Sequence, residues 1–480
     1  MSKQKHQNEN ETQPKRETFE KLHDKKPVTR RDFLGAGLIP FGATLILPDW
    51  LRIMANAGVA EAAELVCKGS GASDLCPFIG IKLSGGAAMS SNFVPMDQGR
   101  QLLSSYTKMG LGNGGSLRLS NEFANNAPFF TDSQILAGIR AGAQASTLRN
   151  SSFVGVCVRS QDDSAGNKFD ITGLVAKAGL NGKILPGLGR ANTETGVNNQ
   201  YAYLRPSAPL IVGRFEDIAG SLGVSGSLAG LSAAQKSNLF RSIASLSASQ
   251  AAKLSEYNSG KTLSQLVQCA NRDNTTLISN TSALNIDPLA NPAFAAIWGI
   301  NNNTAKNSQN FVFASMVFNA INGNASTVNL EMGGFDYHNG TRQTGDTRDL
   351  EAGTVIGRVL QSLAVLGKKG FVVVTSDGGV SSAESASDTA PWMSDRGTAG
   401  TAYMIGYDPA GAHATKSFQL GHFNAGQTAD DNFLTGASAE LAAGAMFANY
   451  LAFNGKVGLV ENFLPRVFST DQLNLITMFS

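Results

Sequence analysis

Three carboxylates and one imidazole in the C-terminal part of the chain are the strongest candidates for metal chemistry. Asp336 and His338 stand two apart in GGFDYH, directly after the apolar run TVNLEM. Asp377 follows the run FVVVTS, and Asp395 lies further on in WMSDRG. These donors suit one divalent ion, which would be Mg²⁺, Mn²⁺, Ca²⁺ or Zn²⁺. The alternative is a polar turn after each strand, because Asp and Asn side chains bond nearby backbone amides.

Ser90 and Ser91 are the candidate nucleophiles of the chain. They lie in GGAAMSSN, a turn rich in glycine and alanine that follows the apolar run FIGIKL. A hydrolytic serine needs a base within reach, and the chain contains no G-x-S-x-G sequence. Arg396 could supply a fixed positive charge beside Asp395. The remaining histidines after residue 57, His413 and His422, are expected to be surface or packed residues.

Five short apolar runs predict the strands that position these residues. The runs are rich in Val, Ile and Phe without alternation, which is typical of a sheet covered on both faces, and they span 78–83, 153–158, 327–332, 371–376 and 402–407. Helical patterns lie at 311–322 and 350–367, the second with Asp346 or Thr347 as its N-cap. This order predicts an α/β fold with a central, mainly parallel sheet flanked by helices. In such sheets, sites form at the carboxyl ends of the strands.

Residues of about 214–275 differ in composition and predict a helical insertion in the sheet domain. Ser232 and Ser247 are each followed three residues later by a glutamine, Gln235 and Gln250, as a capping box requires. We therefore expect two modest helices here, which could form a lid.

The N-terminal segments predict export. Residues 1–28 are polar and are interpreted as a disordered tail. Residues 29–57 begin with TRRDFL, continue with an apolar stretch and end at Ala55-Asn56-Ala57, in the order of a twin-arginine signal peptide. A buried helix and an uncleaved anchor are the alternatives. We expect the twin-arginine translocase as a partner, a periplasmic or extracellular location, and one domain over 58–480.

Composition and cysteines narrow the function further. The 480 residues carry 39 Lys and Arg against 37 Asp and Glu, a formal net charge of +2, which gives no reason to expect nucleic acid as a partner. Cys67 and Cys76 could close a short disulfide loop, whereas Cys157, in FVGVCV, is expected to be a buried thiol. The sequence GLGRANTETG lacks the third glycine of a dinucleotide-binding loop, so we do not expect a dinucleotide cofactor.

Taken together, the twin-arginine leader, GIKLSGGAAMSSNFVP, GGFDYH, VVVTSDGG and SDRGTAG resemble one known family. This is domain of unknown function 1501, whose members are twin-arginine-exported, sulfatase-like proteins of the alkaline phosphatase superfamily. The resemblance covers most of 78–465 and implies an alkaline phosphatase-like fold. It also implies that Asp336 and His338 match the Asp-x-His pair of the family, while Asp377 and Asp395 match acidic ligand positions.

Several positions depart from the family pattern. Gly85-Gly86-Ala87-Ala88 lacks the early carboxylate of the family, and Arg396 replaces a ligand histidine. We therefore expect a reduced metal site that, if active, hydrolyses a phosphate or sulfate ester. The alternative is a non-catalytic envelope protein that binds a small ester or another ligand through the same cleft. The sequence does not predict an oligomeric state.

Overall fold

A computed structural model gives the fold of the chain. It describes residues 75–159, 170–178, 185, 187–190, 209–221, 230–254, 285–325, 327–335, 342–376, 379, 382 and 400–479. The tail at 1–28 and the twin-arginine segment at 29–57 lie outside this range, so the predictions made for them stay predictions.

Eight strands of the described residues form one sheet, in the order β10-β4-β9-β8-β1-β7-β5-β6. The five predicted runs are confirmed as β1 (Phe78–Leu83), β4 (Ser151–Val158), β7 (Thr327–Met332), β8 (Gly370–Ser376) and β9 (Gly400–Tyr407). Short strands complete the sheet, namely β5 (Leu188–Gly189), β6 (Leu210–Ile211) and β10 (Gln419–Leu420). β9 runs antiparallel to β4 and β8, while the other pairings are parallel, so the sheet is mainly parallel as predicted.

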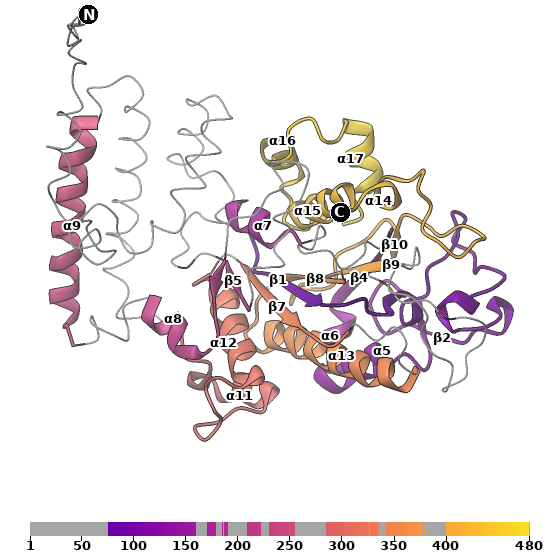
Figure 1. Ribbon diagram of the computed structural model, residues 1–480, viewed down its shortest axis with the longest axis horizontal. Helices are drawn as coiled ribbons and strands as arrows, with labels where there is room; N and C mark the ends of the chain where they lie inside the picture. Colours follow the sequence, from indigo (N-terminus) through magenta and orange to yellow (C-terminus); the bar gives the residue numbers. More distant parts are fainter. Residues whose placement is uncertain are drawn as a thin grey trace, which may run out of the picture.

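Helices cover both faces of the sheet (Figure 1). One face carries α5 (Gln134–Gly142), α6 (Ala145–Arg149), α11 (Pro292–Trp298), α12 (Gln309–Ile321) and α13 (Arg342–Val365). The other carries α7 (Thr172–Ala178), α14 (Leu434–Ala437), α15 (Ala439–Phe453), α16 (Val460–Phe463) and α17 (Thr470–Ile476). Each face has its own apolar core: Ile79 and Ile81 of β1 point into the first, and Phe78 points into the second. This explains the unbroken apolar runs of the strands.

The predicted helices are partly confirmed. The pattern at 311–322 corresponds to α12. The start predicted for the helix at 350–367 is wrong, because α13 begins at Arg342 and contains both Asp346 and Thr347 in its interior. The first two turns of α13 are polar, so the spacing of apolar residues in the sequence does not show where the helix begins.

The described part of 214–275 holds α8 (Phe215–Ser221) and α9 (Ala233–Leu254). The capping box at Ser232 is confirmed, since Gln235 N donates to Ser232 Oγ at 3.2 Å and Ser232 N donates to Gln235 Oε1 at 2.8 Å. The second helix start, at Ser247, is wrong because Ser247 lies inside α9, which is one continuous helix. Figure 1 shows α9 at the far end of the molecule from the sheet, and its role as an insertion or lid stays a prediction.

Helices α5 and α13 meet backbone to backbone. A Cβ atom on Gly138 would overlap Leu350 O, and one on Gly353 would overlap Ile135 O. The contact continues one turn further, where a Cβ on Gly142 would lie 2.6 Å from Thr354 O. Glycines spaced by four on both helices therefore allow an approach so close that no side chain would fit between the two backbones.

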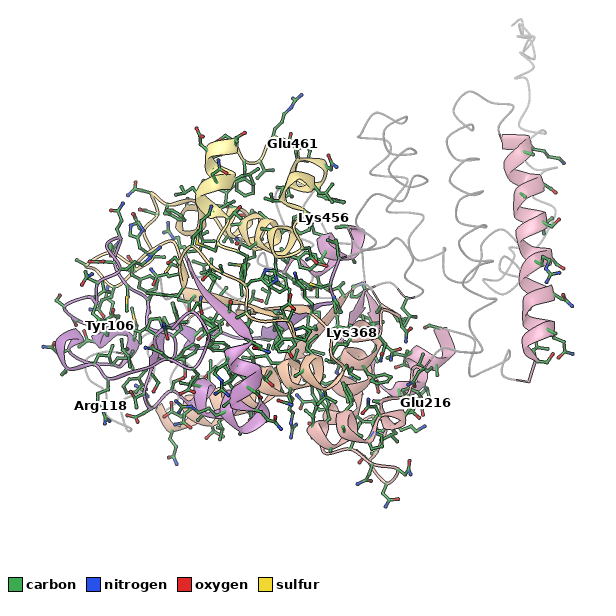
Figure 2. All side chains as sticks on the ribbon, turned by 180° about the vertical axis from the view of Figure 1, so that it is seen from behind. Tyr106, Arg118, Glu216, Lys368, Lys456 and Glu461 are labelled. Atoms are coloured by element: carbon green, nitrogen blue, oxygen red, sulfur yellow. The ribbon has the colours of Figure 1, made fainter. Side chains whose placement is uncertain are left out.

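Residues 94–120 form a separate cover at the end of the molecule opposite α9, where Figure 2 labels Tyr106 and Arg118. The segment contains η2 (Thr107–Met109) and η3 (Gly114–Ser116), and it ends in β2 (Leu119–Ser120), which pairs antiparallel with β3 (Phe129–Phe130). Its own small core includes Tyr106, Met109, Cys157 and Phe423. Cys157 is therefore a buried thiol, as predicted, and burial raises its pKa.

Replacing Gly353 with alanine is expected to destabilise the protein by about 3 kcal/mol, because α13 must shift away from Ile135 and its packing on α5 is then lost. Urea unfolding followed by circular dichroism measures the change. Gly458→Ala is the matched control, since a Cβ there meets no atom within 4 Å. Equal stability of the two variants would contradict the close helix contact.

Candidate functional site

Four neighbouring strands bring the candidate segments to one edge of the sheet. β7, β1, β8 and β9 are adjacent, and the pairing aligns Leu83 with Met332 on one side and with Ser376 on the other. The segments that leave β1, β7 and β8 therefore start level with one another, about 4.8 Å apart from strand to strand. Because β9 is antiparallel to β8, the segment that enters it at Gly400 arrives at the same edge.

The predicted metal ligands and the predicted cation belong to two connections, from β7 to α13 and from β8 to β9, and they lie outside the described residues: Asp336, His338, Asp377, Asp395 and Arg396. The structure fixes the residues that bracket them. Phe335 is fully buried and its N–H donates to Ser84 O at 3.1 Å. Among the described residues, no group of three or more His, Cys, Asp or Glu side chains could hold a metal ion. The predicted ligand set therefore stays a prediction.

Ser90 and Ser91 lie in a single 3-10 turn, η1 (Met89–Ser91). Ser91 is eight residues after Leu83, the last residue of β1. Both are buried, with 2% and 3% of their surface exposed. Within the described part of the chain, the Oγ atom of Ser91 has no hydrogen-bond partner. A buried hydroxyl without a partner costs free energy, so it is a group that a ligand or a neighbouring segment could satisfy.

The first half of the segment between β1 and these serines is tied to β7 and β8. Ser84 N donates to Met332 O at 2.9 Å. The hydroxyl of Ser376 donates to Leu83 O and accepts from Ala87 N, both at 2.9 Å. Since Ser376 is the last residue of β8, the same bonds fix the point from which Asp377 departs.

The second half of the segment is held by Asn92, which is 2% exposed. Its Nδ2 donates to Asp349 Oδ2 at 2.7 Å and to Ala88 O at 3.1 Å. Its Oδ1 accepts from Ser133 Oγ at 2.7 Å and from Ile135 N at 3.1 Å. These four bonds use the full capacity of the amide. Asn92 thereby joins the serine turn to the start of α5 and to α13.

The cover formed by residues 94–120 is attached to the same loops. Nη1 of Arg342, at the start of α13, donates to Gly110 O at 2.6 Å. The N–H of Ser382, in the segment that follows β8, donates to Lys108 O at 2.7 Å. The cover therefore flanks the sheet edge at which Asp336 and Asp377 begin their loops.

A buried polar group on the α7 face of the sheet was missed by the sequence predictions. Lys82 is 1% exposed on β1, between Glu331 and Thr375 of the flanking strands, and Asp170 is 8% exposed. Asp170 Oδ2 accepts from Asn329 Nδ2 at 2.6 Å. Burial raises the pKa of Asp170, although Thr172 and Lys82 oppose the shift. A lysine in the otherwise apolar FIGIKL was the one available signal, because a charged residue in a doubly covered strand must find compensation.

The remaining histidines are packed into the protein, as predicted. His422 Nε2 lies 2.8 Å from Asp430 Oδ2, and His413 Nε2 lies 3.0 Å from Asp408 Oδ2. His413 is also 3.0 Å from the ammonium of Lys369, beside the amino end of β8 and thus away from the candidate site. Cys76 carries a free thiol, which contradicts the predicted disulfide between Cys67 and Cys76. Burial raises the pKa of this thiol to about 12, although the hydrogen bond with Asn454 opposes the shift.

No protein-family model, curated protein or solved structure matches this chain. The family resemblance accordingly rests on the motifs quoted for it. None of the helices that the structure describes is long and apolar enough to cross a membrane.

Replacing Asn92 with aspartate is expected to destabilise the protein at neutral pH, because a second carboxylate would then face Asp349 at hydrogen-bonding distance. Repulsion raises the pKa of the pair in the folded state. The folded state then binds a proton more tightly than the unfolded state, so the loss should shrink as the pH falls through this raised pKa. Urea unfolding at pH 7 and at pH 5 measures the effect. Asn454→Asp, at the end of α15, is the control, and a pH-independent loss in Asn92→Asp would contradict the arrangement.

Proposed function

We propose that this chain is an exported hydrolase of phosphate or sulfate esters with an alkaline phosphatase-like fold and a reduced metal site. One observation carries the proposal. The strands β7, β1, β8 and β9 are neighbours, so the described residues Met332, Leu83, Ser376 and Gly400, from which the candidate segments depart, lie at a single edge of the sheet. This supports the proposal, because sites in such sheets form beyond the carboxyl ends of the strands.

The chemistry of the donor set fits one divalent ion. Asp336, Asp377 and Asp395 would offer carboxylate oxygens, and His338 would offer an imidazole nitrogen, which together suit Mg²⁺, Mn²⁺, Ca²⁺ or Zn²⁺. Such an ion supplies Lewis-acid stabilisation of developing negative charge. A second ion has less support, since the described segment 84–92 contains no carboxylate.

In the proposed reaction, the Oγ atom of Ser91 or Ser90 attacks the phosphorus or sulfur of the ester. The bond to the alcohol oxygen breaks, the alcohol leaves with a proton, and water then releases phosphate or sulfate and restores the serine. Ser91 is favoured because its buried hydroxyl has no partner within the described residues. The bonds of Ser376 and Asn92 hold the turn in place before substrate arrives, which lowers the cost of orientation.

A non-catalytic envelope protein is the second candidate function. The lack of a carboxylate in 84–92 and the presence of Arg396 favour it, because both reduce the number of metal ligands. Such a protein would bind a small ester or an envelope partner at the same edge. In both cases the twin-arginine translocase would deliver the chain to the periplasm or the cell exterior.

The test uses full-length protein exported by a bacterium with a twin-arginine pathway. Bound metal is measured by mass spectrometry, and hydrolysis is measured with para-nitrophenyl phosphate and para-nitrophenyl sulfate. We expect about one ion per chain, and we expect Asp336→Ala and His338→Ala to lose both the ion and about a hundredfold or more in rate. His413→Ala is the control, because His413 lies near the amino end of β8.

Two results would contradict the hydrolase proposal. Metal that remains bound in both Asp336→Ala and His338→Ala would place the ion elsewhere. A correctly exported protein without metal and without activity on either ester would favour the binding protein instead.

A further inference from the structure

A lysine, an asparagine and an acid are buried together on the face of the sheet that α7 covers. They are Lys82 of β1, Asn329 of β7 and Asp170, which comes two residues before α7. Asp170 Oδ2 accepts a hydrogen bond from Asn329 Nδ2 at 2.6 Å. An amine, a carboxamide and a carboxyl group are the three groups from which an amide bond between two side chains can form.

The pairing of β1 with β7 places Lys82 and Asn329 on the same face of neighbouring strands. Asn329 pairs with Gly80, and a Cβ atom on Gly80 would lie 3.5 Å from Asn329 Oδ1. Residues two apart in a strand share a face, so the side chain of Lys82 leaves β1 on the same side. The Cα atoms of Lys82 and Asn329 are then about 8 Å apart, which the four-carbon stem of a lysine can span.

Asp170 interacts with both of these side chains. Burial raises the pKa of Asp170, and the positive charge of Lys82 opposes this shift, as do the hydrogen bonds from Thr172. The negative charge of Glu331, which lies opposite Lys82 in β7, raises the pKa further. Transfer of a proton from Lys82 to Asp170 replaces two buried charges with a neutral amine and a neutral acid, and a low-dielectric interior favours this change.

We propose that Lys82 and Asn329 form an intramolecular isopeptide bond, with Asp170 as the group that transfers protons. The neutral amine of Lys82 attacks Cγ of Asn329, the bond from Nζ to Cγ forms, and the bond from Cγ to Nδ2 breaks. Asp170 first takes a proton from the Lys82 ammonium, and it then gives a proton to Nδ2 and receives one from Nζ. Ammonia leaves, Asp170 ends protonated, and no oxidant or cofactor is consumed.

The hydrogen bond at 2.6 Å supports this assignment, because it places Asp170 at Nδ2, the nitrogen that leaves. The bond would join the two strands from which the serine turn and the loop of Asp336 depart. Lys82 and Asn329 are about 250 positions apart in the chain, so the link would restrict the unfolded state much as a disulfide does. The inference does not depend on the proposed hydrolase activity.

The test is the mass of the full-length exported chain after denaturation, with its N terminus determined separately. We expect wild type to weigh about 17 Da less than its mature sequence, which is the mass of one ammonia molecule. A tryptic digest should contain one branched peptide that includes both Lys82 and Asn329. Lys82→Met and Asn329→Ala should have their full masses. Asp170→Asn should form the bond about a hundredfold more slowly, because it cannot transfer protons.

Lys369→Met is the control variant. Lys369 is also partly buried beside the sheet, but its ammonium donates to Phe453 O at 2.7 Å, at the amino end of β8. This variant should keep the loss of mass and the branched peptide. Thermal unfolding shows which of the variants are folded.

Three results would overturn the inference. A folded wild-type chain of full mass would do so whatever the variants do. A loss of about 18 Da that remains in Asn329→Ala would show that Lys82 has condensed with a carboxyl group and released water. Bond formation at the wild-type rate in folded Asp170→Asn would remove Asp170 from the reaction.

Discussion

The backbone contact between α5 and α13 is the constraint on which the candidate site depends. Gly138 and Gly353 let the two helices approach until their carbonyl oxygens occupy the space of absent Cβ atoms. This approach brings Ser133, at the start of α5, and Asp349, of α13, to the same amide of Asn92. If the helices were further apart, the carboxylate of Asp349, which is 3% exposed, would lose the hydrogen bond from Asn92. Loss of a donor to a buried carboxylate is costly in a low-dielectric interior. The helix contact and the position of the serine turn are therefore linked.

The described edge of the sheet is built from two kinds of interaction. Hydrogen bonds of Ser376 and Asn92 fix the serine turn, and the buried group around Lys82 and Asp170 fixes α7 on the other face of the sheet. Neither arrangement occupies the hydroxyl of Ser91 within the described residues. The residues that hold the described edge in place were therefore not singled out by the sequence, whereas Ser90 and Ser91, which were, lie in the turn that these residues hold.

The sequence predicted the strands well because a doubly covered strand must be apolar on both faces, and FIGIKL and FVVVTS show this directly. It did not predict that β9 is antiparallel, because an apolar run has no direction. The start of α13 and the false start at Ser247 failed for a related reason: both lie in polar helical turns, where the apolar period that marks a helix is weak. The role of Asn92 could not be predicted, since its partner Asp349 lies 257 residues away in the chain.

The charges of the proposed site bear on how an anionic ligand could enter it. Asp336, Asp377 and Asp395 would bring three negative charges to the edge, against the guanidinium group of Arg396. An oxyanion that approaches this set alone meets net repulsion, which grows as burial lowers the effective dielectric constant. A divalent cation would reverse the sign of that field. Under the proposed function, binding of the oxyanion is therefore coupled to binding of the cation.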